Sequence, residues 1–266
     1  MEDELKPVRE RVSLLKVPID IVEPDQLGVL AFHLLLEGKP QNIVLLSLWD
    51  LLRARRNAEY REYVKNASLV IPISKSIVSG IRFLLGKRAV RYMPFDFAVN
   101  LLTALETSEF SCYLLGGDTK VLLKIEKNIN DTFPGLQVVG RVPGSFKKQR
   151  EPDIIRSICK SAPSILLVGK GIKGGERWIA RNNAHLGNGL RMWCSDLFDV
   201  FAKRKQHPPQ ARFELGLEWI DYCLQNPLKV FRIFPYLYFK LLLLVYKLFK
   251  TDNSGKTKSG ELNPAS

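Results

Sequence analysis

Short apolar runs of strand length alternate with longer amphipathic stretches through most of this 266-residue chain. The clearest apolar runs are residues 42–47, 68–73, 111–115, 164–168 and 190–194. Between two of these runs, apolar residues recur at helical spacing, at Val121, Leu122, Ile125 and Ile129. Parallel strands need crossover connections and are buried on both faces. The pattern therefore predicts an α/β, Rossmann-like fold, in which a mostly parallel sheet between residues 42 and 194 carries helices on both faces.

Glycine turns follow two of the predicted strands. Gly116-Gly117 comes directly after one strand, and Gly169-Lys170-Gly171 follows another. The carboxyl ends of parallel strands meet at one edge of a sheet, where α/β folds bind ligands, so we expect the two turns to lie together. They fit a phosphate or nucleotide pocket, and they fit ordinary tight turns equally well. The chain contains neither a Walker A sequence nor a GxGxxG motif.

Residues 228–250 form the most unusual segment of the chain. On a helix, the basic residues of this segment would share an arc of roughly 80°, and Leu, Phe, Tyr, Ile and Val would cover the rest. These basic residues are Lys229, Arg232, Lys240, Lys247 and Lys250. Aromatic residues beside basic ones favour a lipid–water boundary, so we interpret the segment as a helix that lies on a membrane surface. A helix in the groove of a partner protein and a spanning helix are the alternatives.

Charge and cysteine content narrow the functional class. The formal net charge of +13 attracts the phosphates of anionic lipid or of nucleic acid. The four cysteines lack CxxC spacing and fit free thiols in a reducing compartment. The three histidines show no metal-ligand or triad spacing. The charged N-terminus lacks the apolar region of a secretory signal, so we expect a cytoplasmic protein.

We expect three parts along the chain. Residues 1–195 form the α/β domain together with an N-terminal strand and helix, and residues 196–250 form a helical, membrane-binding appendage. Residues 251–266 are polar and rich in Gly and Ser, a composition that predicts a disordered tail.

Several short motifs occur in an order that resembles one enzyme family. The strongest is Gly216-Leu217-Glu218-Trp219, which is followed by Gln225 and Pro227. The supporting motifs are Leu115-Gly116-Gly117, Pro134-Gly135-Leu136, Gly144 with Phe146, the run ERWIARN that begins at Glu176, and Phe198-Asp199. Together they cover residues 42–234, and they resemble the WecB/TagA/CpsF (WecG/TagA) family of glycosyltransferases.

The resemblance implies an inverting hexosyltransferase that uses no metal and no cofactor. Such enzymes transfer N-acetylmannosamine or a related hexose from a UDP-sugar donor to a polyprenyl-diphosphate-linked sugar acceptor. They act in cell-envelope polysaccharide synthesis, at the cytoplasmic face of the membrane, to which a C-terminal appendage carries them. This implication agrees with our interpretation of residues 228–250, and it predicts a peripheral membrane protein. The sequence is compatible with a homo-oligomer but does not specify one.

The chain departs from the family pattern where the chemistry would occur. The family has an aspartate after its second strand, the proposed general base, whereas this chain has Ile73, which cannot accept a proton. Asp96 and Asp199 are the candidates to replace it, although either could instead cap a helix. The positions that match substrate-binding ones, including glycines and arginines that could hold a diphosphate, are Ser47, Gly116, Gly117, Gly144, Gly171, Glu176, Arg212 and Arg232.

Three functional hypotheses follow from these observations. The first is a working transferase in which another aspartate replaces the base. The second is a non-catalytic relative that binds a nucleotide-sugar or a lipid-linked sugar as a scaffold. The third is a nucleic-acid-binding protein, which only the charge favours, because the chain carries no recognition motif. We favour the transferase, keep the scaffold as its alternative, and expect no nucleic-acid partner.

Overall fold

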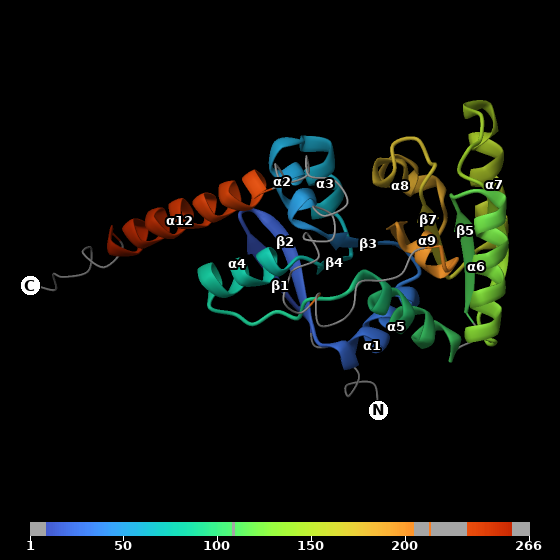
Figure 1. The fold of residues 1–266 in the computed structure, drawn as a ribbon, viewed down its shortest axis with the longest axis horizontal. Helices are drawn as coiled ribbons and strands as arrows, with labels where there is room; N and C mark the ends of the chain where they lie inside the picture. Colours follow the sequence, from blue (N-terminus) through green and yellow to red (C-terminus); the bar gives the residue numbers. More distant parts are fainter. Residues whose placement is uncertain (1–8, 108–109, 205–212, 214–232, 257–266) are drawn as a thin grey trace, which may run out of the picture.

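The computed structural model describes residues 9–107, 110–204, 213 and 233–256. A six-stranded sheet lies at its centre, with the strand order β4-β3-β8-β7-β5-β6 and parallel pairing throughout (Figure 1). The strands are β3 (Pro40–Leu46), β4 (Leu69–Pro72), β5 (Ser111–Leu115), β6 (Gln137–Val142), β7 (Ile165–Gly169) and β8 (Gly189–Ser195). Each apolar run identified in the sequence overlaps one of these strands, and the predicted α/β fold with a parallel sheet is confirmed.

Helices cover both faces of the sheet, because alternate strand side chains enter two separate hydrophobic cores. The first face packs against α1 (Leu27–Leu36), α5 (Pro94–Glu106), α6 (Thr119–Thr132) and α9 (Leu197–Phe201). The second face packs against α2 (Leu48–Arg56), α3 (Ala58–Lys65), α4 (Lys75–Leu85), α7 (Glu151–Ser161) and α8 (Glu176–Asn182). Short 3-10 turns in the described residues also connect these elements: η2 (Pro24–Gln26), η3 (Lys148–Arg150) and η4 (Asn183–His185).

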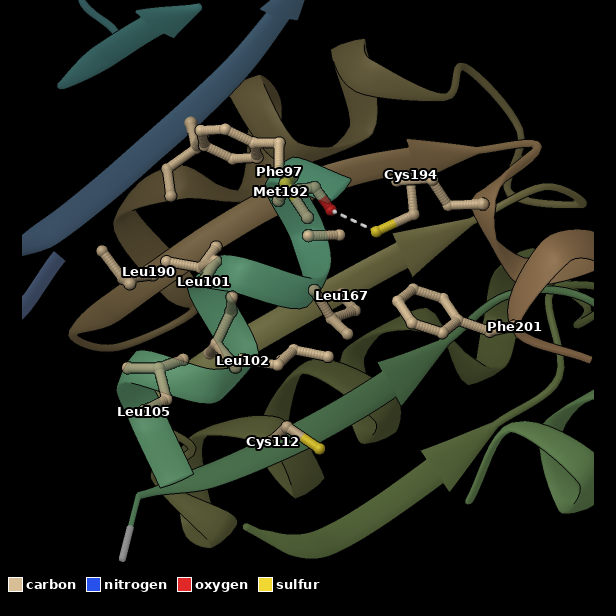
Figure 2. Close-up of a cluster of buried hydrophobic side chains, with 14 of the residues drawn as sticks. Phe97, Leu101, Leu102, Leu105, Cys112, Leu167, Leu190, Met192, Cys194 and Phe201 are labelled. Carbon is tan, nitrogen blue, oxygen red and sulfur yellow. Dashed lines mark hydrogen bonds between the residues drawn. The ribbon is translucent and has the colours of Figure 1, made fainter. Parts of the chain in front are cut away.

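Figure 2 shows the core on the first face, where α5 lies across the middle of the sheet. The labelled side chains come from α5, from β5, β7 and β8, and from α9: Phe97, Leu101, Leu102, Leu105, Cys112, Leu167, Leu190, Met192, Cys194 and Phe201. Burying each large apolar side chain stabilises the fold by about 1.5–3 kcal/mol. Cys112 and Cys194 are buried free thiols, as the sequence predicts, and burial raises the pKa of Cys112 to about 12.

An antiparallel hairpin of β1 (Arg9–Leu14) and β2 (Val17–Val22) lies beside the edge strand β4. Its contact with β4 centres on Asp20, whose side chain is fully buried. Both carboxylate oxygens of Asp20 accept hydrogen bonds from Arg11 at 2.8 Å, and one also accepts from the Val70 N–H at 2.7 Å. The hairpin thus satisfies a backbone donor of an edge strand that would otherwise be open to pairing.

Helix α12 (Ile233–Lys256) projects away from the sheet in Figure 1 and packs at its first half against α4. Phe239 and Leu243 are buried there, and Gly80 of α4 lets them approach: a Cβ at Gly80 would lie 3.0 Å from the Phe239 ring. The helix ends at Lys256, and the disorder predicted for residues 251–266 stays a prediction. Apolar contacts of the preceding turns and helix propagation extend the helix into polar sequence.

No helix within the described parts of the chain combines the length and the apolar composition needed to cross a bilayer. The first part of the predicted membrane segment, residues 228–232, lies outside the described residues. The same holds for Cys223 and for residues 257–266.

Candidate functional site

All six strands of the sheet end at one edge, which we call the carboxyl edge. The turns that form it follow Leu46, Pro72, Leu115, Val142, Gly169 and Ser195. This is the edge at which α/β folds bind their ligands.

Three glycine turns meet at the carboxyl edge through direct backbone contact. The Gly117 N–H donates to the Lys170 carbonyl at 2.6 Å, and the Gly144 N–H donates to the Gly117 carbonyl at 2.9 Å. The Gly116 N–H donates to the Val142 carbonyl at 2.9 Å. The turns after β5, β6 and β7 therefore lie together, as we expected for the first and third. These three N–H groups are engaged within the protein, so a diphosphate would either displace these bonds or bind to other groups of the edge.

The close approach of these turns requires glycine for a steric reason. Gly116 has φ +124°, and a Cβ there would lie 2.7 Å from the carbonyl carbon and oxygen of Gly169. A Cβ at Gly144 would lie 2.7 Å from the Lys170 carbonyl oxygen and 3.0 Å from the Gly171 Cα. Any side chain at either position would force the strand ends apart.

Asp199 lies at the same edge, beside the β7 turn. Lys170 forms ion pairs with Asp196 and with Asp199, the second at 3.5 Å between Nζ and Oδ2. The N-cap residue of α9 is Asp196, and Asp199 lies within the first turn of the helix, so the interpretation of Asp199 as a helix cap is wrong. Its carboxylate is partly exposed and pairs with a cation at the end of β7.

Serine hydroxyl groups lie at the helix N-termini that follow β3 and β4, and the one of Ser74 joins the two strand ends. Ser47 caps α2 in a capping box: its Oγ accepts from the Asp50 N–H at 3.3 Å, and the Asp50 carboxylate accepts from the Ser47 N–H at 3.1 Å. The Ser74 Oγ accepts from the Leu48 N–H at 3.0 Å. Ile73 lies between these two turns, and its half-buried side chain belongs to neither hydrophobic core.

Between α2, α3 and α8 lies a group of partly buried charged side chains and buried phenolic ones, which we call the α2–α8 cluster. It consists of Asp50, Arg53, Tyr60, Tyr63 and Glu176. Arg53 Nη1 is 3.2 Å from Glu176 Oε2, and the Arg53 guanidinium stacks on the Tyr60 ring at 4.0 Å from its centroid. The Glu176 side chain is only 13% exposed. Arg53 of α2 therefore contacts α8 through its ion pair with Glu176 and α3 through its stacking on Tyr60.

Burial controls the titration of this cluster. The pKa of Glu176 is raised to about 7: burial is the largest cause, the negative charge of Asp50 adds to it, and Tyr60 and Arg53 oppose both effects. Burial also raises the pKa of Asp50, against the hydrogen bonds from Ser47 and the charge of Arg53. The pKa of Tyr60 is raised by burial first and then by the charges of Asp50 and Glu176. Ionisation of one of these groups therefore changes the pKa of the others.

Arg91 lies on the connection between α4 and α5, and Asp96 lies in the first turn of α5. Asp96 is exposed in the first turn of α5, whose N-cap residue is Met93, so the interpretation of Asp96 as the helix cap is wrong. Its charge there favours the helix N-terminus instead. The Arg91 Nε donates to the Ile73 carbonyl at 3.0 Å, and its guanidinium stacks on the Phe213 ring at 3.7 Å. Arg91, which the sequence did not single out, therefore reaches the end of β4.

The remaining candidates fall outside the described residues. These are Arg212, Arg232 and the motif at residues 216–227. Among the residues that are described, no three His, Cys, Asp or Glu side chains gather in a way that could hold a metal ion.

The sequence was compared with known protein families and with curated proteins. Residues 12–255 match the model of the glycosyl transferase WecG/TagA/CpsF family. The chain belongs to this family. It is also similar to the N-acetylglucosaminyldiphosphoundecaprenol N-acetyl-beta-D-mannosaminyltransferase of Bacillus spizizenii, with 24% identity over 175 residues, which are 65% of this chain and 67% of the relative. The resemblance drawn from short motifs is therefore confirmed at the level of the WecG/TagA/CpsF family.

In this WecG/TagA/CpsF member, sequence reasoning named Glu176 and Ser47 but missed the partners that surround them. The Ser47-x-x-Asp50 spacing after an apolar run is a capping-box signature, and it could have drawn attention to Asp50. Nothing in the local sequence pairs Arg53 with Glu176, because the two residues are 123 positions apart.

The first prediction concerns the contact between glycine turns. Gly116→Ala should lower the free energy of unfolding by about 3 kcal/mol, because the new Cβ meets the Gly169 backbone and the residue keeps a positive φ. Urea denaturation measures the effect. Gly86→Ala is the matched control, since Gly86 also has a positive φ but a Cβ there would have no atom within 4 Å, and it should cost about 1 kcal/mol. Equal losses in the two variants would contradict the steric explanation.

The second prediction concerns stability and pH. The pKa of Glu176 rises from an ordinary 4.5 to about 7, so between these values the folded chain keeps a proton that the unfolded chain loses. The stability of the wild type should therefore fall as pH rises through this window, by up to about 3 kcal/mol. The Glu176→Gln variant has no ionisable group at this position, so its stability should fall much less between the same pH values. The free energy of unfolding of both proteins is measured by urea denaturation at pH 4.5 and pH 8. An equal fall in the two proteins would contradict the raised pKa of Glu176.

Proposed function

We propose that this chain transfers an N-acetylmannosamine-like hexose from a UDP-sugar to a polyprenyl-diphosphate-linked sugar, in the synthesis of a cell-envelope polysaccharide. The observation that carries the proposal is the family match over residues 12–255. The name of the Bacillus spizizenii relative describes a mannosaminyl transfer to an acceptor whose diphosphate is linked to undecaprenol. That name gives the class of transferred sugar and of acceptor that we propose here, and the UDP donor is proposed from the family resemblance.

The carboxyl edge supplies groups for each part of such a reaction. Lys170 and Arg91 lie at the ends of β7 and β4, where cations could neutralise a diphosphate leaving group. Arg212 and Arg232 are proposed for the same task, as the sequence indicates. In an inverting transfer, a carboxylate takes the proton of the acceptor hydroxyl as that oxygen attacks the sugar. Asp199, at the edge itself, and Asp96, on α5, are the proposed proton acceptors.

One observation favours a binding scaffold as the alternative. Ile73 occupies the strand end at which the family resemblance places an aspartate, and an isoleucine cannot take a proton. A scaffold would hold the nucleotide-sugar or the lipid-linked sugar without turnover.

The third prediction separates the transferase from the scaffold. Purified protein is incubated with UDP-N-acetylmannosamine and a polyprenyl-diphosphate-N-acetylglucosamine analogue, and the release of UDP and the disaccharide product are measured. Turnover by the wild type excludes the scaffold. UDP binding in calorimetry without turnover excludes the transferase, and the absence of UDP affinity at millimolar concentration counts against both.

The same transfer assay on the Ile73→Asp variant tests whether Ile73 replaces a general base. If Ile73 marks the position of a lost base, the variant should increase transfer on the order of 10²-fold, the typical contribution of a positioned base. Ile73→Asn is the matched control, because it has nearly the same size but takes no proton. A folded Ile73→Asp variant that is no more active than Ile73→Asn would refute the assignment.

We also propose that α12 binds the membrane surface. One stripe of this helix is apolar and exposed, with side chains that are 53–68% exposed at Leu237, Leu241, Leu244 and Leu248. These residues recur at helical spacing on the side opposite Phe239 and Leu243, which pack against α4. Cations lie beside the stripe: Lys240 is exposed on α12 itself, and Arg56 of α2 lies over Tyr238. An apolar stripe with adjacent cations matches an anionic bilayer surface.

The fourth prediction tests this surface. Wild-type protein should sediment with vesicles of phosphatidylglycerol and phosphatidylcholine, and less with phosphatidylcholine alone. The double change Leu241→Asp and Leu248→Asp should reduce binding at least tenfold, because each aspartate would bring a charge into the acyl boundary. Leu123→Asp is the control, since Leu123 is also exposed, at 47%, but lies on α6. Unchanged vesicle binding by the double variant, or its equal loss in Leu123→Asp, would contradict the proposal.

A further inference from the structure

A group of exposed cations lies beside the glycine turns, on the two segments that follow β6 and β7. These cations, which we call the basic rim, are Lys147, Lys148, Arg150 and Lys173. Together, residues 144–151 and 170–178 carry six cations and only two carboxylates. The two segments are therefore strongly basic.

The two segments lie against each other at both of their ends. At the first end, a Cβ at Gly171 would lie 3.3 Å from the Gly144 Cα. At the other end, the Trp178 Nε1–H donates to Glu151 Oε1 at 2.7 Å. Because the rim residues lie between these two contacts on both segments, their side chains share one stretch of the surface. That stretch begins at the glycine turns of the carboxyl edge.

The backbone of both segments is anchored beneath the basic rim. Ile172 is buried in the second hydrophobic core, and Phe146 packs against the same core. The rim side chains themselves are exposed. The segments are therefore held on one face of the sheet while their charges face solvent.

Nearby carboxylates do not neutralise the charge of the basic rim. Within the part of the chain that the structure describes, no rim side chain forms an ion pair. The carboxylates of the neighbouring turns and helices have other partners: Asp118 pairs with Arg204, Asp196 and Asp199 pair with Lys170, Glu176 pairs with Arg53, and Glu151 accepts from Trp178. The rim therefore presents its positive charge to solvent.

The basic rim lies at the opposite end of the sheet from α12. The strand order places β7, β5 and β6 on one side of β8, and β3 and β4 on the other. Helix α12 packs against α4 and α2, which follow β4 and β3, and Figure 1 shows α12 and α7 at opposite ends of the molecule. A charge at the β6 end is poorly placed to bind the surface that α12 would bind. Its position favours a dissolved anion as the ligand.

We propose that the basic rim is the entry surface for the donor: it attracts the diphosphate of the nucleotide-sugar from solution and directs it to the adjacent glycine turns. The inference rests on the proposed function, because it takes the carboxyl edge to be the donor site. Lys170, at the edge itself, is engaged by Asp196 and Asp199, so an approaching anion first meets the unpaired cations of the rim. Like charges clustered at the entrance of a site raise the association rate of an oppositely charged ligand by about 10- to 1,000-fold.

This role predicts an effect on association rather than on dissociation. Exposed ammonium groups stay hydrated and act on a ligand through their field, which extends about 10 Å at an ionic strength of 0.1 M and about 3 Å at 1 M. Once the donor has reached the edge, other groups hold it. Loss of the rim charges should therefore change the association rate constant kon and its dependence on salt, and leave the dissociation rate constant koff almost unchanged.

The experiment compares the wild type with a triple variant of the rim, Lys147→Gln, Lys148→Gln and Lys173→Gln. Stopped-flow fluorescence with UDP that carries a fluorescent label on its ribose gives kon, and displacement by unlabelled UDP gives koff. At low ionic strength, kon of the variant should be about tenfold below that of the wild type, and koff should change by less than about twofold. The difference in kon should vanish at about 1 M salt.

The matched control removes the same charge from the opposite edge of the sheet. Lys39, Lys65 and Lys160 are exposed and precede β3, β4 and β7, so changing these three residues to Gln gives the same net charge. This control should keep kon within about twofold of the wild-type value. A further triple variant, with Arg in place of the three rim lysines, keeps the charge and should keep kon, whereas a contact that requires lysine would be lost.

The possible outcomes separate this proposal from the proposed function. Equal kon values for the wild type and the rim variant at low ionic strength would overturn the entry surface alone, and so would an equal loss in the control of the opposite edge. A rim variant that loses binding to phosphatidylglycerol vesicles while its kon for UDP is unchanged would assign the rim to a membrane instead. If the wild type binds no UDP at any salt concentration, the proposed function fails, and the entry surface fails with it.

Discussion

Backbone contact between the glycine turns is the constraint on which the carboxyl edge depends. The turns after β5, β6 and β7 exchange hydrogen bonds in series, from Gly144 to Gly117 and from Gly117 to Lys170. Such contact brings main chains closer than any side chain would permit. The strands beneath are buried on both faces, so the sheet cannot adjust its spacing to accept a larger residue. The position of Lys170, and with it the ion pairs of Asp196 and Asp199, follows from this contact.

The other half of the edge is held by side chains. Capping of α2 by Ser47 and acceptance of the Leu48 N–H by Ser74 fix the ends of β3 and β4. The α2–α8 cluster then joins this half to the β7 turn through Arg53 and Glu176. Steric contact is insensitive to solution conditions, whereas a buried group of titratable side chains is not. The two halves of the candidate site therefore differ in how they respond to pH.

The two sides of α12 face different environments: one packs against α4, and the other is exposed. One of its sides buries Phe239 and Leu243 against α4, where Gly80 allows close contact. The opposite side leaves a row of large apolar residues exposed, more than a soluble surface usually presents along one helix. Docking by one side fixes the direction in which the other side points, so the body of the protein would sit at a defined orientation on any surface that the helix binds.

The sequence by itself determined the sheet, the positions of its strands and the family. Continuous apolar runs specify buried parallel strands whatever their partners, and glycine turns that follow strands meet at one edge because parallel strands end together. The hairpin was not apparent, because Leu15 and Lys16 occupy its turn at positive φ, where Asn-Gly would be the usual signal. Asp96 and Asp199 were possible helix caps but lie inside the first turns of their helices, because a helix start can be located from sequence only to within a few residues.

Only the tertiary structure decided which charges meet. Arg53 and Glu176 are far apart in the chain, and their contact depends on the crossing of α2 and α8 over the sheet. The same holds for the Arg91 guanidinium at Ile73 and for Asp20 at the β4 edge. Local sequence sets backbone conformation and the burial pattern, which depend on near neighbours. Pairing and pKa depend on the distance between groups through the folded protein and on their burial, and neither quantity exists before the chain has folded.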